Sequence, residues 1–273
     1  MQWRFLILLV FLVFGSLLIA QAQEELISHS TIQILDDDSF TAENGVIAGT
    51  GTPEDPYIIG GWTIDATGEQ YGIQIKKTTK AFIIEDCRIV GAGCDGIRLE
   101  GLTRACVIGC RFCENTYGLS MENVKGATIE DNTFLDSGKI AIFMNSSSQN
   151  ELRGNRIPKA QIGLAMMRES KNNQIHDNVF DHCGLGIKIY SSCGGNHLYK
   201  NDFLDCRASS DSYNLWDDGA GVGNYWGNYQ GEDADGDGIG DDPYQLLGNG
   251  YERDRYPTLS PIHPDKTDEL PTD

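Results

Sequence analysis

The sequence contains few basic residues and few histidines for its length. Its 273 residues include 21 Lys and Arg, 40 Asp and Glu, and 5 His, which gives a formal net charge of −19. Nucleic acids and anionic lipids are bound through clustered Lys and Arg, and no long cluster of these residues is apparent. We therefore expect no nucleic-acid partner and no face that binds polyanions. Metal cations and neutral or weakly charged glycans are better electrostatic partners.

Long apolar runs are equally scarce, and only one is placed to contact a membrane. It extends from Phe5 to Ala20, follows Arg4, and ends beside an Ala-x-Ala cleavage site. This arrangement is typical of a secretory signal peptide, which we assign to residues 1–22. The alternative is an uncleaved anchor, because the run is near the lower limit for crossing a bilayer. We predict a monomer that is exported to the extracellular space or the periplasm, with no other membrane contact.

A sustained hydrophobic period of 3.6 residues is absent, which argues against helical and leucine-rich repeats. Instead, pairs of apolar residues five apart return every 22 to 25 residues. The pairs are Ile59/Ile64, Ile84/Ile89, Val107/Phe112, Ile129/Phe134, Leu152/Ile157, Ile175/Phe180 and Leu198/Phe203. Upstream of most pairs, a small residue precedes alternating apolar positions, as in Gly72-Ile73-Gln74-Ile75. Alternation with a period of two indicates strands, and such short units must stack on one another. The pattern predicts an all-β, single-stranded right-handed parallel β-helix of about seven coils.

Asparagines form a further column in this repeat. They follow the first member of each of the last four apolar pairs by three residues, at Asn132, Asn155, Asn178 and Asn201. Asparagines stacked at one turn can bond their neighbours in the next coil, which leaves few buried polar groups unpaired. We predict that this ladder holds the fold together and has no catalytic role.

Eight cysteines in an exported chain permit disulfides. Cys87 and Cys110 occupy the same position in successive repeats, as do Cys183 and Cys206. Adjacent coils would place the members of each pair about 4.8 Å apart, a Cα separation that a disulfide tolerates. Two disulfides could therefore form. The alternative is a stacked column of small buried thiols.

The repeat also divides the chain into segments. Residues 23–58 form a lead-in that we expect to cap the first coil, and residues 59–206 hold the coils. Residues 207–260 are rich in Gly, Asp and aromatic side chains, and we expect them to fold over the last coil. Residues 261–273 are short, acidic and rich in proline, which predicts a disordered tail.

The sharpest local motif is an Asp-rich loop at residues 233–242. Carboxylates at its first, third, fifth and ninth positions, a glycine at the sixth and a carbonyl at the seventh can surround a hard cation such as Ca²⁺. The predicted ligands are Asp233, Asp235, Asp237, the Ile239 carbonyl and Asp241, with Asp242 in reserve. The loop departs from an EF-hand because its twelfth position is Tyr244 instead of Glu. We expect a structural Ca²⁺ site here, and the alternative is a solvated acidic turn.

Further motifs flank the coils. They are Gly51-Thr52-Pro53-Glu54-Asp55-Pro56-Tyr57-Ile58-Ile59-Gly60-Gly61-Trp62, Gly223-Asn224-Tyr225-Trp226-Gly227-Asn228-Tyr229, Pro243-Tyr244 and Arg255-Tyr256-Pro257. With the coils, they resemble exported β-helix proteins of the NosD-like type, within a wider group of carbohydrate-binding and sugar-hydrolase β-helices. The resemblance covers nearly the whole mature chain. It implies the pectate-lyase-like fold strongly and an activity weakly, because one scaffold hosts lyases, hydrolases, epimerases and non-enzymes.

One outward column of the predicted coils gathers candidate catalytic residues. It holds Glu130, Arg153, His176 and Tyr199, with Lys200 one residue further on. A polysaccharide lyase or epimerase needs a base near a uronate C5 proton and a cation beside the carboxylate, and this column could supply both. A surface ladder of mixed charges is the alternative. Nothing in the sequence marks the carboxylate pair that a glycoside hydrolase requires.

Copper delivery is the role attached to the name-giving NosD-like protein, and copper sites use His, Met and thiolate ligands. His176 and His182 would share a coil near Cys183, but no His-x-His pair is present and Met166-Met167 is the only methionine cluster. We therefore expect no copper site. We predict a non-catalytic exported protein that binds extracellular or cell-surface polysaccharide and is stabilised by Ca²⁺. The alternatives are a polysaccharide lyase, epimerase or hydrolase, and a periplasmic copper-site maturation factor.

Overall fold

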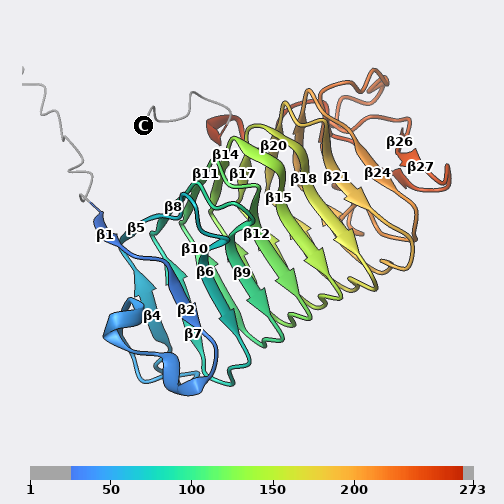
Figure 1. Ribbon diagram of the computed structural model, residues 1–273. Coiled ribbons are helices and arrows are strands. Elements are labelled where there is room, and N and C mark those ends of the chain that lie inside the picture. Colours follow the sequence, from blue (N-terminus) through green and yellow to red (C-terminus); the bar gives the residue numbers. More distant parts are fainter. Residues whose placement is uncertain (1–25, 267–273) are drawn as a thin grey trace, which may run out of the picture.

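The computed structural model describes residues 26–266, which wind into a parallel β-solenoid of about seven turns (Figure 1). Three long sheets run along the rod, and each full turn adds one strand to sheet C, then to sheet A, then to sheet B. The predicted all-β parallel solenoid is therefore confirmed. The predicted signal peptide or anchor, residues 1–22, lies outside the described residues. Within residues 26–266, no helix has the length and apolar character needed to cross a membrane.

The strands of the three sheets are short, and nearly all of them pair in parallel with the next coil. Sheet A contains β1 (Ile27–His29), β5 (Trp62–Asp65), β8 (Arg88–Val90), β11 (Arg111–Cys113), β14 (Thr133–Leu135), β17 (Arg156–Ile157), β20 (Val179–Asp181), β23 (Asp202–Leu204) and β25 (Tyr225–Trp226). Sheet B contains β2 (Ile32–Ile34), β6 (Tyr71–Lys76), β9 (Asp95–Glu100), β12 (Tyr117–Glu122), β15 (Ser137–Asn145), β18 (Ala160–Met167), β21 (Leu185–Ile189), β24 (Ala208–Ser210) and β27 (Leu247–Gly248). Sheet C contains β3 (Val46–Ala48), β4 (Tyr57–Gly60), β7 (Phe82–Glu85), β10 (Ala105–Ile108), β13 (Thr128–Glu130), β16 (Glu151–Arg153), β19 (Gln174–His176) and β22 (His197–Tyr199).

The core runs along the rod axis between the three sheets. Both members of every apolar pair found in the sequence are buried, the first in sheet C and the second in sheet A. Alternate residues of sheet B, such as Ile73 and Ile75, complete the interior. Burying each such side chain contributes about 1.5–3 kcal/mol, so the repeated pairs supply the main force that stacks the coils.

Glycine at the start of the sheet B strands has a steric cause. A Cβ atom on Gly118 would lie 2.4 Å from Cδ1 of Phe134 and 2.6 Å from the carbonyl oxygen of Ala141 in the next coil. Phe134 itself stacks on Phe112 with ring centroids 4.5 Å apart. The small residue therefore makes room for the aromatic stack of sheet A.

The lead-in, described from residue 26 to residue 58, caps the solenoid and also adds strands to it. Strands β1 and β2 pair in parallel with β5 and β6, whereas β3 lies antiparallel to β4. The short 3-10 helices η1 (Asp37–Ser39) and η2 (Ala42–Asn44) connect β2 to β3.

The C-terminal segment covers the last coil and ends in an ordered stretch. A two-stranded sheet of β26 (Tyr244–Gln245) and β28 (Arg253–Asp254) folds at that end of the rod (Figure 1). The disorder predicted from residue 261 is wrong for residues 261–266, which include η3 (Pro264–Lys266). The N–H groups of Ile262 and His263 each donate to the Asp202 carboxylate at 2.8 Å. Asp202 is buried, and a buried carboxylate must be hydrogen-bonded. These two hydrogen bonds therefore hold residues 262–263 against the last coil.

Candidate functional site

The asparagine ladder lies at the turns between sheets C and A. Asn178 donates from Nδ2 to the Asn201 side chain at 2.9 Å and to the Leu152 carbonyl at 2.9 Å. Its Oδ1 accepts from the main chain of Asn155 at 3.0 Å and from the Asn155 amide at 2.9 Å. These bonds confirm the predicted ladder. Its members are fully or almost fully buried and their donors and acceptors are occupied by protein groups.

A second ladder, which the sequence analysis missed, lies at the turns between sheets B and C. Asn150 donates to Asn173 at 2.9 Å, Asn173 donates to Asn196 at 2.9 Å, and Asn196 donates to Asn214 at 2.9 Å. The first three are 23 residues apart, so the signal was present in the sequence.

Both ladders end on a buried carboxylate of the C-terminal segment. The first continues to Asn224, which donates to Asp254 from its main chain at 2.7 Å and from its side chain at 3.1 Å. The second ends where the main chain of Asn214 donates to Glu252. Each carboxylate oxygen thus takes the place that the next asparagine oxygen would occupy. Burial raises the pKa of Asp254 to about 6, although the Trp226 indole N–H donates to it.

The cysteines proposed to form disulfides are free in the structure, as are the other four. The thiols of Cys87 and Cys110 contact main-chain carbonyls, at 3.8 Å from Ile59 and Ile84 respectively. Cys183 and Cys206 are likewise buried in successive coils. The alternative of a stacked column of small buried thiols therefore describes this structure.

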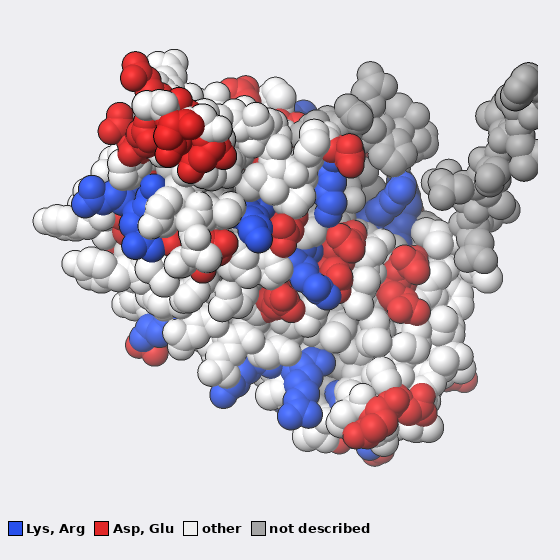
Figure 2. Space-filling view, turned by 180° about the vertical axis from the view of Figure 1, so that it is seen from behind, with Lys and Arg blue, Asp and Glu red and all other residues white. Residues whose placement is uncertain are grey.

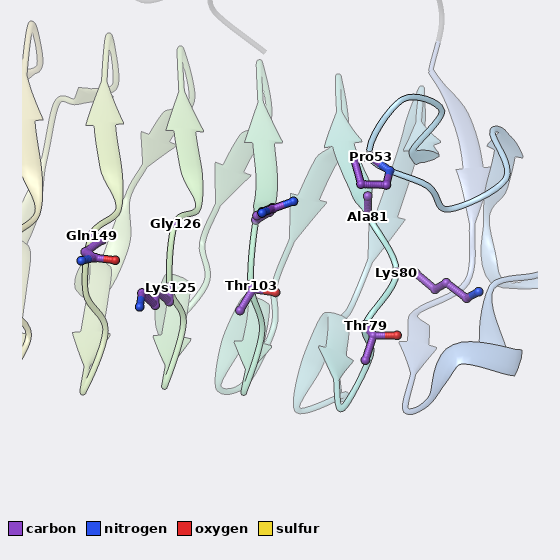
Figure 3. A pocket seen from close by; sticks show the side chains of 9 residues that line it. Pro53, Thr79, Lys80, Ala81, Thr103, Lys125, Gly126 and Gln149 are labelled. Carbon is purple, nitrogen blue, oxygen red and sulfur yellow. The ribbon is translucent and has the colours of Figure 1, made fainter.

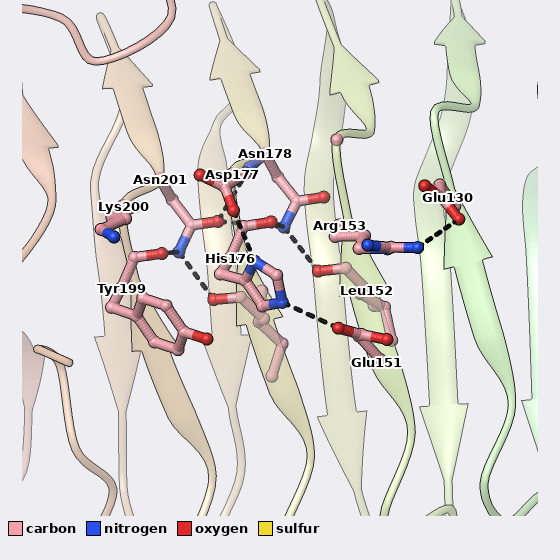
Figure 4. A network of polar contacts seen from close by, with 12 residues as sticks. Glu130, Glu151, Leu152, Arg153, His176, Asp177, Asn178, Tyr199, Lys200 and Asn201 are labelled. Atoms are coloured by element: carbon pink, nitrogen blue, oxygen red, sulfur yellow. Dashed lines mark hydrogen bonds and ion pairs between the residues drawn. The ribbon is translucent and has the colours of Figure 1, made fainter.

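The candidate catalytic column is assembled as predicted on sheet C. Glu130 pairs with Arg153, Arg153 with His176, and His176 with Tyr199 in the strand register, and Lys200 follows (Figure 4). The groups are bound to one another: Arg153 donates to Glu130 at 2.7 Å, and the His176 ring stacks on Tyr199 with centroids 4.9 Å apart.

The histidine of this column is not free to act as a base. Nδ1 of His176 lies 2.6 Å from Asp177, and Nε2 lies 3.1 Å from Glu151. The hydrogen bond to Asp177, with Glu151 acting in the same direction, raises the pKa of His176 and favours the imidazolium. Burial raises the pKa of Tyr199. A base must be unprotonated and within reach of a substrate proton, so the column has the properties of a charge ladder.

The Asp-rich loop brings together three of its predicted ligands. One carboxylate oxygen each from Asp233, Asp235 and Asp237 lie within 4.8 Å of one another. The structure does not add Asp241 to this group, and its Oδ2 accepts instead from the N–H of Ala234 at 2.8 Å. The N–H of Ile239 donates to Asp237 at 2.8 Å. Figure 2 shows the densest patch of acidic side chains at the C-terminal end of the rod, where this segment folds.

A hollow that the sequence analysis missed lies along the turns between sheets B and C. It has a volume of about 440 Å³, and we call it the turn groove (Figure 3). Successive coils line it with Thr79, Lys80, Thr103, Arg104, Lys125 and Gln149. Pro53 of the lead-in lines it as well, in the loop whose Gly51 carbonyl accepts from the N–H of Ala81 at 3.0 Å.

The turn groove gathers three cations and no acid among its lining residues. Thr103 pairs with Lys125, and Lys125 with Ser148, so these turns keep the coil register. The turn groove is therefore a small group of basic side chains that no cluster in the sequence indicates. The residues are more than 20 positions apart in the sequence, and only the winding of the coils brings them together.

The residues present do not fit a copper site. Within residues 26–266, three or more His, Cys, Asp or Glu side chains converge at one place only, at Asp233, Asp235 and Asp237. These carboxylates are hard oxygen ligands, which copper sites seldom use. His176 is occupied by carboxylates, and Met166 is buried in the core. The thiols of Cys87 and Cys110 are buried and contact main-chain carbonyls.

Comparison with known families gives one match that covers more than half of the chain. The sequence profile described as periplasmic copper-binding protein (NosD) matches residues 29–183 and again residues 78–231. No curated protein matches the chain. The two overlapping matches cover the coils, as expected for a repeat that fits the profile in more than one register. The chain therefore belongs to the NosD family.

Proposed function

We propose that this chain is a non-catalytic exported protein that binds extracellular or cell-surface polysaccharide in the turn groove. The observation that carries the proposal is the groove itself, an open hollow lined by hydroxyl, amide and cationic side chains from successive coils. Such groups suit the hydroxyls and acidic substituents of sugars. Coils follow one another at about 4.8 Å, so a chain of sugar rings lying along the rod can meet equivalent donors repeatedly.

The absence of catalysis in this proposal rests on the groups that are present. No His, Asp or Glu lines the turn groove, so a carboxylate pair for glycoside hydrolysis is absent from it. The column from Glu130 to Tyr199 does not line the turn groove. Glu130 is bound by Arg153, and His176 is bound by Asp177.

The test is to incubate the mature protein with neutral and uronate polysaccharides and to follow both retention on the polymer and release of new chain ends. We expect retention without new ends. Thr103→Trp should fill the groove and abolish retention, whereas Thr133→Trp, on β14 of sheet A, is the matched control. New chain ends from any polymer would contradict the non-catalytic role, and retention that Thr103→Trp leaves unchanged would exclude this groove.

We further propose that Ca²⁺ braces the Asp-rich loop through Asp233, Asp235 and Asp237. Their convergence supports this proposal. Ca²⁺ at about 100 times its dissociation constant should raise the free energy of unfolding by about 2.7 kcal/mol. Thermal unfolding with and without Ca²⁺ measures this effect. Asp235→Ala should remove it, and Glu54→Ala, an exposed acid at the other end of the rod, should not. Equal Ca²⁺ responses of the two variants would contradict the site.

A further inference from the structure

We propose that the turn groove selects anionic polysaccharides, with Lys80, Arg104 and Lys125 as the residues that bind their carboxylate or sulfate groups. This inference rests on the proposed function and adds the class of polysaccharide. It reverses the expectation from the overall charge, since a protein with a formal net charge of −19 would repel a polyanion over most of its surface.

The first argument is that no acid lies within ion-pair distance of these cations, whereas several cations elsewhere are neutralised by one. Arg98 contacts Glu122 at 2.6 Å, Lys188 contacts Asp211 at 2.8 Å, and Arg255 contacts Asp217 at 2.6 Å. Within residues 26–266, no ion pair within 4.0 Å involves a groove cation. Lys80 feels the field of Asp37, but the carboxylate of Asp37 is occupied by hydrogen bonds from Thr78 and Thr79. Three cations are therefore available to a ligand in a chain that has twice as many acids as bases.

The second argument is the spacing along the rod. Thr103 pairs with Lys125, and Phe82 pairs with Ala105, so Lys80, Thr103 and Lys125 occupy one position in three successive coils. The Cα atoms of the two lysines are then about 10 Å apart at the usual strand spacing, with Thr103 between them and Arg104 next to it in the chain. Lysine side chains have flexible stems, so their ammonium groups can meet anionic groups that recur along a polymer. Figure 2 shows basic side chains following one another along the lower edge of the rod.

The third argument separates a glycan from a nucleic acid. Proteins that bind single strands combine cations with aromatic side chains on which bases stack, and no aromatic residue lines the turn groove. Its other polar side chains are Thr79, Thr103 and Gln149, which offer hydroxyl and amide groups for sugar hydroxyls. These features favour the anionic glycan.

The experiment compares two triple variants with the same change in charge. Lys80→Gln, Arg104→Gln and Lys125→Gln together neutralise the groove. Lys139→Gln, Lys159→Gln and Arg207→Gln neutralise three exposed cations outside it. The probes are polygalacturonate, dextran sulfate, neutral dextran and a single-stranded oligonucleotide. Binding is measured by calorimetry in 0.1 M salt, where the Debye length of about 10 Å screens the distant acidic charges. Thermal unfolding checks that both variants fold.

We expect the groove triple to weaken binding of an anionic polysaccharide at least about tenfold, while the control triple changes it less than about threefold. Binding of the polyuronate, the sulfated polymer or both supports the inference and names the anion. Equal affinity for neutral dextran overturns it and leaves the proposed function intact, whereas binding of no polysaccharide overturns both. Equal weakening by the two triples, or tighter binding of the oligonucleotide, also overturns it.

Discussion

At the residue scale, buried asparagines carry much of the specificity of the fold. Each rung satisfies main-chain groups of two coils as well as its neighbouring side chain, so an apolar replacement leaves several buried groups without partners. For Asn178→Ala these include the N–H of Asn155 and the carbonyl of Leu152. Leaving such groups unpaired costs roughly 1–3 kcal/mol each.

We therefore predict that Asn178→Ala lowers the free energy of unfolding by roughly 2–4 kcal/mol. Chemical denaturation measures this loss. Gln174→Ala is the control, because Gln174 lies on the same coil with an exposed side chain and should change the stability by less than about 0.5 kcal/mol. A loss no larger than that of the control would show that water replaces the missing amide.

The two asparagine ladders could be predicted from the sequence, but the carboxylates at their ends could not. The ladder from Asn132 to Asn201 was predictable because its members keep a fixed distance from the apolar pairs. The ladder from Asn150 to Asn196 keeps the same period and was within reach of the same method. Asp254 and Glu252 were not, because they enter the ladders from a non-periodic segment. Their role depends on a tertiary contact that the sequence repeat does not indicate.

At the element scale, apolar pairs five residues apart fixed the strands of sheets C and A, since both members had to point inward. The same register places Cys87 beside Cys110 and Cys183 beside Cys206, which is why disulfides were considered. In the structure these thiols are buried and contact carbonyl groups, as Cys183 does with Ile157 at 3.6 Å. Proximity in adjacent coils therefore indicated stacking and did not decide the redox state.

The expected number of thiols in the denatured, unreduced protein is eight. The native protein should react slowly, because six of its cysteines are buried, and only Cys94 and Cys106 are partly accessible. Titration with a thiol reagent before and after denaturation measures both numbers. Six thiols after denaturation would mean that one pair is oxidised, and four would mean that both are; protein treated first with a reductant gives the reference count.

At the scale of the whole molecule, the net charge does not reveal the local distribution of charges. The net charge of −19 describes the average, whereas winding brings Lys80, Arg104 and Lys125 to one groove. Average composition cannot foresee this, because the position of a turn residue along the rod depends on the register of every preceding coil. The same winding places the candidate catalytic column on sheet C as predicted, but its partners could be seen only in three dimensions.

The closed C-terminal end of the rod gives the last prediction, a dependence of stability on pH. Burial raises the pKa of Asp254 from 3.8 to about 6, against opposing hydrogen bonds from Trp226 and the N–H groups of Asn224 and Tyr256. Between about pH 4 and pH 6 the folded protein therefore holds a proton that the unfolded chain has released. Unfolding then releases protons, so stability falls as the pH rises through this window, by on the order of 3 kcal/mol from this group.

Other acids also make the free energy of unfolding depend on pH. The comparison is therefore between the wild type and Asp254→Asn, whose side chain cannot titrate at this position. We expect the stability of the wild type relative to this variant to fall from pH 4 to pH 6 and to stay constant above pH 7. Urea denaturation at a series of pH values measures this difference, with Asp38→Asn as an exposed control that should leave the profile unchanged. Parallel profiles for the wild type and Asp254→Asn would mean that the carboxylate is already ionised at pH 4 in the folded protein. In that case the N–H donors at the end of the first ladder would outweigh the cost of burial, because hydrogen bonds to the charged form favour it.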